Sequence, residues 1–361
     1  MIPASSVPSP GTIFQSDSPT PDYPARRSAL VSSLQSGIDV GAIRRNGSGV
    51  TDWTIHGGRL AAAQAHWTDA PQPWLDLSTG INPHRWPVER AGPIDWHRLP
   101  DDAALAALEA AAAASFGVPA DSVCATPGSE IALRLVATLD LPSPHRFVAP
   151  GYRTHEEAFD TATAVAPDAA AALDEGTLLL ARPSNPQGLL HPLPPRGVRL
   201  IVDEAFADAV PEASILPRPD AIVLRSFGKF FGLAGVRLGF VIAPPAILAR
   251  IRHRLGSWPV SAAAIAIGTA AYRDIDWQAD MRDRLAREAR ALDVILARHA
   301  LAFQGDCPLF RLVRTPDATA LFEQLARAGI LTRPFDRARD WLRFGLPGSN
   351  AALDRLDRAL G

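Results

Sequence analysis

Short apolar runs alternate with longer helical patterns between residues 99 and 245 of the chain. The runs are rich in Val, Ile and Leu, and helical segments separate them. Buried strands with this composition are typical of a mostly parallel sheet that is covered on both faces. The pattern therefore predicts an α/β fold, with strands at "RFVAP" (146–150), "GTLLLARP" (176–183), "VRLIVDEAF" (198–206), "AIVLRSF" (221–227) and "LGFVIAP" (238–244).

Helices are predicted before and between these strands. The segment "DDAALAALEAAAAASFG" is rich in alanine, which has the highest helix propensity. Asp101 or Asp102 is a suitable N-cap for this helix, and Gly117 is a suitable residue to end it. A second helix, "SEIALRLVATL", is predicted directly after Pro127 and Gly128.

The pattern of apolar and polar residues changes after residue 245. Three helical patterns follow one another, and shorter strands and helices then complete an α+β unit. We expect a large α/β domain at 88–245 and a smaller C-terminal α+β domain at 246–361. The segment 51–87 is expected to contribute to the active site. Residues 1–50 are rich in Ser and Pro and are predicted to be a disordered N-terminal extension.

Composition and charge exclude several classes of protein. The net charge of the 361 residues is −2, so it gives no electrostatic reason to expect nucleic acid or a membrane surface as a partner. No apolar run reaches the eighteen or so residues of a membrane span. The two cysteines, Cys124 and Cys307, form neither a disulfide framework nor a metal motif. These observations predict a cytoplasmic protein with reduced cysteines and no metal site.

One lysine stands in an unusual setting, in the stretch "RSFGKFFGLAGVRLGF" (225–240), although nearly all of the 36 basic residues are arginines. Lys229 follows an apolar strand and lies beside Phe227, Phe230 and Phe231. An ammonium that is desolvated in this way has a lowered pKa, which favours the neutral, nucleophilic amine. The competing interpretation is a surface lysine whose charge stays in water.

Three further motifs follow predicted strands, at the edge of the sheet where ligands bind in open α/β folds. "TPGSE" (126–130) opens a helix, so the amides of Gly128 and Ser129 are candidates to hold a phosphate, although helix capping explains them equally. "ARPSNPQG" (181–188) contains Asn185 before a proline, where a turn is the simpler explanation. "LIVDEAFAD" (200–208) ends an apolar strand with Asp203, which needs a cation or a donor to offset its burial.

Together these motifs supply a lysine for an aldehyde, an acid for a pyridine nitrogen and donors for a phosphate, which are the requirements of pyridoxal 5'-phosphate. Their order and spacing closely resemble the fold-type I pyridoxal-phosphate enzymes, the aspartate aminotransferase superfamily, from about residue 56 to the C-terminus. This resemblance implies a large domain with a mostly parallel, seven-stranded-type sheet and a smaller C-terminal domain of α+β type. It also implies a homodimer.

The resemblance assigns a role to each motif. Lys229 corresponds to the lysine that binds the cofactor, Asp203 to the partner of the pyridine nitrogen, and Asn185 to the donor for the ring 3'-oxygen. Tyr152, in "APGYRTH", corresponds to the aromatic residue that stacks on the ring, although a core aromatic is the simpler explanation of its pattern. The phosphate would be held by Gly128, Ser129, Ser226 and Arg237.

Two positions depart from the pattern of the superfamily. Many relatives have a tyrosine three residues after the aspartate, where this chain has Phe206, so one contact to the 3'-oxygen is not expected. Relatives also often have "RYPD" where this chain has "RLPD" (98–101). Leu99 lacks the hydroxyl with which that tyrosine contacts a phosphate in the neighbouring subunit.

Three stretches resemble one group within the superfamily, the threonine-phosphate decarboxylases of cobalamin biosynthesis, whose near relatives are histidinol-phosphate aminotransferases. They are "IHGGRLAAA" (55–63), "LDLSTGINPHRWP" (75–87) and "RPF…WLRFGLPG" (333–348). The resemblance implies that Arg343 binds the substrate carboxylate and that His56, Asn82 and Arg333 lie toward the substrate phosphate. A turn histidine and a surface arginine are the simpler explanations of His56 and Arg333.

These features predict a lyase that converts L-threonine O-3-phosphate to (R)-1-amino-2-propanol phosphate and CO2. The alternative is an aminotransferase that acts on a phosphorylated amino substrate such as histidinol phosphate. Both reactions use the same residues, because the bond that breaks is the one held perpendicular to the cofactor ring. A third interpretation, a regulator or scaffold without catalysis, is disfavoured because the lysine and the aspartate are both present.

Overall fold

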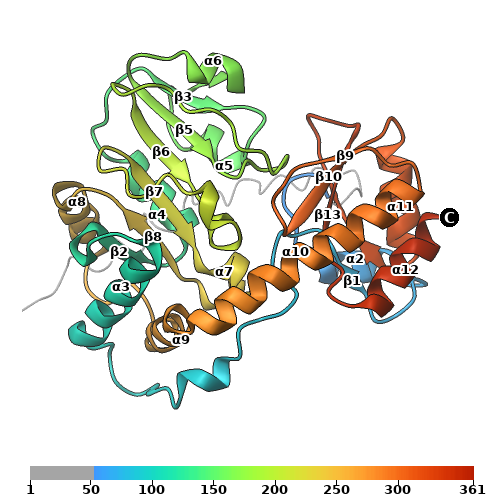
Figure 1. The fold of residues 1–361 in the computed structure, drawn as a ribbon, viewed down its shortest axis with the longest axis horizontal. Helices are drawn as coiled ribbons and strands as arrows, with labels where there is room; N and C mark the ends of the chain where they lie inside the picture. The colour runs from blue at the N-terminus through green and yellow to red at the C-terminus, as the bar shows by residue number, and fades with distance from the viewer. Residues whose placement is uncertain (1–52) are drawn as a thin grey trace, which may run out of the picture. The chain divides into compact units, whose positions relative to one another are not determined.

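The five predicted strands and two further strands form one seven-stranded sheet in a computed structural model that describes residues 53–361 (Figure 1). The predicted extension at 1–50 lies outside the described residues. The strand order is β2-β8-β7-β6-β5-β3-β4, and β8 runs antiparallel to both of its neighbours while the other pairs are parallel. The strands are β2 Val123–Thr126, β3 His145–Val148, β4 Thr163–Val165, β5 Thr177–Ala181, β6 Arg199–Asp203, β7 Ile222–Ser226 and β8 Gly239–Ile242.

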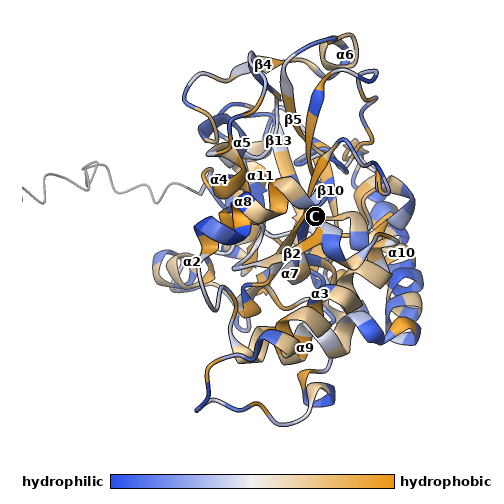
Figure 2. Ribbon diagram, turned by 90° about the vertical axis from the view of Figure 1, so that its left-hand side faces the viewer, coloured by the Kyte–Doolittle hydropathy of each residue, from blue (hydrophilic) through white to orange (hydrophobic). Residues whose placement is uncertain are grey.

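Both faces of this sheet are buried, as the apolar runs predicted. Successive side chains of a strand point to opposite faces, so neighbouring leucines of β5 belong to different clusters. Leu178 and Leu180 pack in the cluster that contains residues of α3 (Asp102–Phe116) and α9 (Ala262–Arg273). Leu179 packs in the cluster that contains residues of α4 (Ser129–Ala137) and α8 (Pro245–Leu255). Figure 2 shows the resulting apolar strands between the helices.

The ends of the predicted helices follow their capping residues. The side chain of Asp101 accepts hydrogen bonds from the amides of Ala103 and Ala104 at the start of α3, and Gly117 ends that helix in the left-handed conformation. The other α-helices are α2 Leu60–His66, α5 Arg153–Glu157, α6 Pro167–Ala171, α7 Phe227–Phe230, α10 Ile275–Arg298, α11 Ala318–Arg327 and α12 Asn350–Leu360. Short 3-10 helices lie at 88–91, 120–122, 207–209, 211–213 and 234–236.

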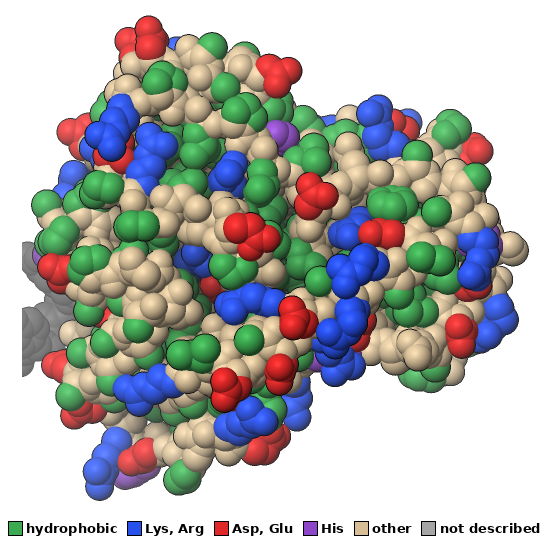
Figure 3. Space-filling view, in the orientation of Figure 1, with side chains coloured by type: hydrophobic (Ala, Val, Ile, Leu, Met, Phe, Trp, Pro, Cys, Tyr) green, Lys and Arg blue, Asp and Glu red, His purple; other side chains and the backbone are tan. Residues whose placement is uncertain are grey.

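The C-terminal part of the chain forms a second, antiparallel sheet with the strand order β12-β13-β10-β9. Its strands are β9 Phe303–Gln304, β10 Phe310–Arg314, β12 Arg333–Pro334 and β13 Trp341–Gly345. Helix α11 packs beside β12 and β13, and α12 packs against α10 and α11. The long helix α10 runs from the seven-stranded sheet to this second sheet (Figure 1). Figure 3 shows arginine and acidic side chains along α10 on the face turned to the viewer.

The segment before the large sheet joins the C-terminal part through a pair of very short strands. β1 (Leu75–Asp76) pairs in parallel with β11 (Ile330–Leu331). This pairing brings the stretch that carries "STGINP" close to the strands that carry Arg333 and Arg343. Within residues 53–361, no helix combines the length and the apolar character that crossing a membrane requires.

Candidate active site

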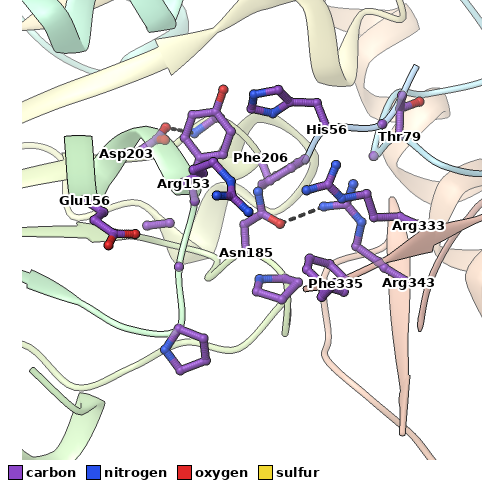
Figure 4. A pocket seen from close by; sticks show the side chains of 18 of the residues that line it. His56, Thr79, Arg153, Glu156, Asn185, Asp203, Phe206, Arg333, Phe335 and Arg343 are labelled. Carbon is purple, nitrogen blue, oxygen red and sulfur yellow. Dashed lines mark hydrogen bonds between the residues drawn. The ribbon is translucent and has the colours of Figure 1, made fainter. Parts of the chain in front are cut away.

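A cavity of about 710 Å³ lies where the strands of the large sheet end and the C-terminal strands approach them (Figure 4). The carboxyl ends of β6 and β7 contribute Asp203 and Ser226, and β12 and β13 contribute Arg333 and Arg343. Ligands of open α/β folds bind at this edge of the sheet. The cavity therefore brings together residues from both ends of the described chain.

Lys229 projects into this cavity from α7, the single helical turn that follows β7. It is the only lysine in the sequence. Burial lowers its pKa from 10.5 to about 8, and the charges of Arg343 and Arg237 act in the same direction, while Asp203 opposes them. Its Nζ lies 5.9 Å from the ring centroid of Phe206. A substantial fraction of the amine is therefore neutral near pH 8, as a nucleophile requires.

Asp203 faces the cavity with a buried histidine behind it. Its Oδ2 lies 3.1 Å from Nε2 of His155, and its Oδ1 accepts a hydrogen bond from the amide of Ala205. The Asp203 residue is 9% exposed and His155 is fully buried. These contacts fix the carboxylate while leaving it at the cavity wall. His155 was not singled out from the sequence, although it lies within the quoted stretch "APGYRTH".

Gly128 and Gly239 form a cradle beside Arg237. A Cβ on Gly128, whose φ is +93°, would lie 2.6 Å from Nη2 of Arg237. A Cβ on Gly239 would lie 2.4 Å from the amide nitrogen of Ser129. Both positions therefore require glycine, because any side chain would fill the space between the α4 N-terminus and the guanidinium. The pairing of Ser226 with Gly239 in the sheet brings Ser226 to the same corner.

One detail of the predicted phosphate site is wrong. The amide of Gly128 does not point out of the helix N-terminus, because it donates a hydrogen bond of 2.7 Å to the carbonyl oxygen of Thr126. Gly128 is the N-cap residue of α4, whose first helical residue is Ser129. The glycine therefore contributes through its missing side chain, and the amide of Ser129 is the candidate donor at this place.

Asn185 and Arg343 contact each other across the cavity. Nη1 of Arg343 donates a hydrogen bond of 2.6 Å to Oδ1 of Asn185, and Nη2 donates to the carbonyl oxygen of Ser78 (Figure 4). Burial lowers the pKa of Arg343 to about 9, with a further contribution from Arg333. Among the described residues, Nε of Arg343 is buried without a hydrogen-bond partner. A buried, partly unsatisfied guanidinium is suited to bind an anion such as a carboxylate.

Tyr152 lies at the cavity wall with its hydroxyl group fixed. Its OH donates to Oε2 of Glu130 at 3.1 Å, and the hydroxyl of Thr154 donates to the other oxygen of the same carboxylate. Burial raises the pKa of Tyr152 to about 12, so the phenol stays protonated at neutral pH. Glu130, which sequence reasoning did not single out, therefore orients the ring of Tyr152.

His56 and Arg333 lie at another part of the same cavity. The ring of His56 lies 6.4 Å from that of Tyr152. Burial lowers the pKa of His56, and Arg333 and Arg153 lower it further. Arg333 donates to the carbonyl oxygen of Ile55, the residue before His56, at 2.8 Å. The strand β12 is thereby joined to the loop that carries His56.

Asn82, which was predicted to lie toward a substrate phosphate, does not line the cavity. Its Nδ2 donates to the carbonyl oxygen of Phe230, and its Oδ1 accepts from the amide of His84. Its own amide donates to the carbonyl oxygen of Lys229. Asn82 is 2% exposed, so it supports the turn that carries Lys229 from behind.

The two departures from the superfamily pattern differ in their surroundings. Phe206 lines the cavity and packs edge-to-face on Phe310 at 5.0 Å. Its ring offers a contact surface without a hydroxyl. Leu99 is 65% exposed and does not line the cavity, and Trp96, three residues earlier in the chain, is 77% exposed.

The residues present fit pyridoxal 5'-phosphate. The cavity contains the amine of Lys229 with its lowered pKa, the fixed carboxylate of Asp203, and a glycine-lined corner in front of Arg237. An added side chain would fill that corner, so the glycines keep the space in front of Arg237 open. The chemistry of this donor set matches the aldehyde, the ring nitrogen and the phosphate of the cofactor.

Comparisons with known proteins agree with this donor set. The family Aminotransferase class I and II matches residues 94–360. The threonine-phosphate decarboxylase of Pseudomonas aeruginosa is 37% identical over 326 residues, which cover 84% of this chain and 96% of that protein. The enzyme of the same name from a Sinorhizobium species is 36% identical over 327 residues, which cover 85% and 97%.

More distant relatives carry other names. A histidinol-phosphate aminotransferase of Symbiobacterium thermophilum is 29% identical over 303 residues, which cover 74% of this chain and 81% of that protein. Among solved structures, histidinol-phosphate aminotransferase from Sinorhizobium meliloti in complex with pyridoxal-5'-phosphate has a TM-score of 0.69 at 20% identity, with coverage of 83% and 93%. This likeness confirms the predicted fold. The chain belongs to the class I and II aminotransferase family, and it is a pyridoxal-phosphate-dependent enzyme.

Proposed function

We propose that this protein removes the carboxyl group of L-threonine O-3-phosphate and forms (R)-1-amino-2-propanol phosphate and CO2, a step of cobalamin biosynthesis. The observation that carries the proposal is the identity of 36–37% to two threonine-phosphate decarboxylases over nearly their whole length. The cavity supports it independently, because arginines line it at more than one position. A substrate with a carboxylate and a phosphate needs two such sites.

The cofactor supplies an aldehyde that binds the substrate amine and a ring that takes up the electron pair of the broken bond. Lys229 would hold the cofactor before the substrate arrives. Asp203, kept in place by His155, would keep the ring nitrogen protonated. Ser129, Ser226 and Arg237 would bind the phosphate of the cofactor in the corner that Gly128 leaves open.

Asn185 and Tyr152 would complete the cofactor site. The Oδ1 of Asn185 already accepts from Arg343, which leaves its amide nitrogen to donate to the 3'-oxygen of the ring. Tyr152, oriented by Glu130, would stack on the ring face. Each of these residues holds the ring at a different atom, so the plane of the ring is defined relative to the substrate.

The orientation of the substrate decides which of its bonds breaks. Arg343 would bind the α-carboxylate, and Arg333 and His56 would bind the phosphate. Two charged groups held at two sites leave the Cα of the substrate little freedom to rotate, which is how positioning selects a reaction. Lys229, with a pKa of about 8, is suited to hold the proton that returns to Cα.

We further propose that the protein is a homodimer and works in the cytoplasm. Large exposed apolar side chains such as Trp96, Leu99 and Ile275 support a surface that a second copy covers. Cys124 and Cys307 are free and buried, which is consistent with a reducing compartment.

The experiment that tests the proposed reaction measures CO2 release from L-threonine O-3-phosphate with and without 2-oxoglutarate. The proposal expects equal release in both reactions, because decarboxylation needs no amino-group acceptor. The aminotransferase alternative expects no CO2 and a strict requirement for the oxo acid, with histidinol phosphate as the better substrate. Lys229→Ala is the negative control, and it should neither bind the cofactor covalently nor release CO2.

A further inference from the structure

Arg153 is one of five arginines that line the cavity, and it directly follows Tyr152 at the start of α5. Its side chain is 26% exposed, so it is only partly screened by water. Figure 4 shows it entering from the side of α5, whereas Arg333 and Arg343 enter from the C-terminal strands. It faces the cavity from a side that the other two arginines do not cover.

The charges of the proposed substrate exceed what two arginines balance. A phosphate monoester carries close to two negative charges at neutral pH, and the α-carboxylate adds another. Arg343 is assigned to the carboxylate. Arg333 has contacts with the carbonyl oxygens of Thr54 and Ile55, which orient its guanidinium. A phosphate with three acceptor oxygens can accept further charge-assisted hydrogen bonds.

In the structure, the guanidinium of Arg153 contacts a carboxylate of the chain itself. Its Nη2 lies 2.6 Å from Oδ2 of Asp336, in the loop between β12 and β13. Asp336 is 43% exposed and also lines the cavity. Burial raises the pKa of Asp336, but the hydrogen bond and charge of Arg153 outweigh this and lower it, so the carboxylate is ionised at neutral pH.

We propose that Arg153 is a specificity-determining residue that binds the phosphate of the substrate, and that Asp336 occupies its guanidinium until that phosphate displaces the carboxylate. The inference rests on the proposed function, because it presupposes a substrate with a phosphate. It adds a residue from α5 to the arginine and histidine already assigned to that group. It also gives Asp336 the role of a competitor that an incoming oxyanion must replace.

A second ion pair provides a matched control. Arg337, next to Asp336, lies 2.5 Å from Oε2 of Glu156, one helical turn after Arg153. Both pairs thus join the same loop to the same helix, and all four residues line the cavity. Arg337 is 67% exposed, and exposed pairs of this kind contribute little to stability. If the two pairs serve only to hold loop and helix together, the loss of either pair will have a similar effect.

The test compares Arg153→Gln, Asp336→Asn and Arg337→Gln with the wild type, all as holoenzymes. The affinity for inorganic phosphate is measured by calorimetry, and the KM for L-threonine O-3-phosphate is measured from initial rates because the holoenzyme turns that ligand over. L-threonine serves as the ligand that lacks a phosphate. We expect Arg153→Gln to weaken binding of both phosphate ligands by about tenfold. We expect Asp336→Asn to strengthen it about threefold, because a competing anion is removed. Affinity for L-threonine should not change.

The proposal predicts changes of opposite sign in phosphate affinity for Arg153→Gln and Asp336→Asn. The proposal is overturned if Asp336→Asn weakens phosphate binding as Arg153→Gln does, because the pair would then be a structural link, or if Arg153→Gln has no effect. Arg337→Gln should bind phosphate like the wild type. If Arg153→Gln lowers the melting temperature, Arg153→Lys serves as the second variant. It keeps the positive charge and should recover part of the affinity for phosphate. Inorganic phosphate needs no turnover, so this result stands apart from the CO2 assay that tests the proposed function.

Discussion

Lys229 is the only lysine of the chain, which makes its titration directly observable. Protein produced with [ε-13C]lysine should give one side-chain resonance in the absence of cofactor. We expect that resonance to titrate near pH 8, since burial and the neighbouring arginines favour the neutral amine. The signal should therefore report mostly neutral amine at pH 9, where an ordinary lysine remains protonated. A midpoint near 10.5 would contradict the desolvated environment.

Replacing Arg343 tests the second cause of that shift. The charge of Arg343 lowers the pKa of Lys229, so Arg343→Gln should move the NMR midpoint upward. Arg314→Gln is a suitable control, because Arg314 is 60% exposed and pairs with Asp340 at the far end of β10. A midpoint that stays constant in Arg343→Gln would show that the charge of Arg343 does not contribute to the lowered pKa of Lys229.

Asp203→Asn should leave the protein folded and lower kcat by about two orders of magnitude. An amide cannot stabilise a protonated ring nitrogen, and removal of one preorganised electrostatic partner typically has an effect of this size. The measurement is the initial rate of CO2 release, with circular dichroism and the absorbance of the bound cofactor as controls for folding and loading. Turnover within about threefold of the wild type would show that Asp203 does not have this role.

At the residue scale, the sequence identifies side chains whose chemistry is rare in their setting. Lys229 among phenylalanines and Asp203 at the end of an apolar strand were recognisable for this reason, and both line the cavity. Asn82 was misplaced because a motif does not tell whether a side chain points to the ligand or to the backbone behind it. His155 was missed because its role depends on a contact with Asp203, 48 positions away.

At the scale of elements, the turn before α4 is the most sensitive to substitution. Gly128→Ala would place a Cβ 2.6 Å from Nη2 of Arg237, in a backbone conformation that alanine rarely adopts. We expect the cofactor to bind at least tenfold more weakly, because Arg237 must move away from the phosphate corner. The dissociation constant can be measured by titrating apoprotein with the cofactor and following its absorbance.

Gly117→Ala is the control for this substitution. Gly117 also has a positive φ, of +68°, but a Cβ there would meet nothing within 4 Å. It should reduce the stability of the protein by about 1 kcal/mol through backbone strain and leave cofactor affinity unchanged. Equal losses of cofactor affinity in both variants would mean that the effect of Gly128→Ala is general destabilisation.

Strands and helices were predictable from the sequence where a local pattern of apolar residues encodes them. The apolar runs correspond to β3, β5, β6, β7 and β8, because strands buried on both faces need continuous apolar residues. The antiparallel direction of β8 was not predictable, since the composition of a strand does not report its direction. The pairing of β1 with β11 joins residues 255 positions apart through two residue pairs, which leaves no periodic signal.

At the scale of the whole molecule, we expect two copies to associate. Trp96 and Leu99 are 77% and 65% exposed on one short segment, and burying them against a second copy would remove apolar surface from water. Light scattering of the purified protein should therefore give twice the chain mass of 38.5 kDa. The double substitution Trp96→Glu and Leu99→Glu should shift the mass toward the monomer. A wild-type monomer at micromolar concentration would contradict the proposed dimer.

The most direct test of the central claim follows L-threonine O-3-phosphate in D2O with the holoenzyme and no oxo acid, and identifies the product by NMR. The account predicts 1-amino-2-propanol phosphate with one solvent deuterium on the former Cα, formed in equal amount to CO2. That result requires that the bond between Cα and the carboxylate breaks and that the bond between Cα and its hydrogen stays intact. Recovery of substrate that carries deuterium at Cα, or formation of an oxo acid, would contradict it.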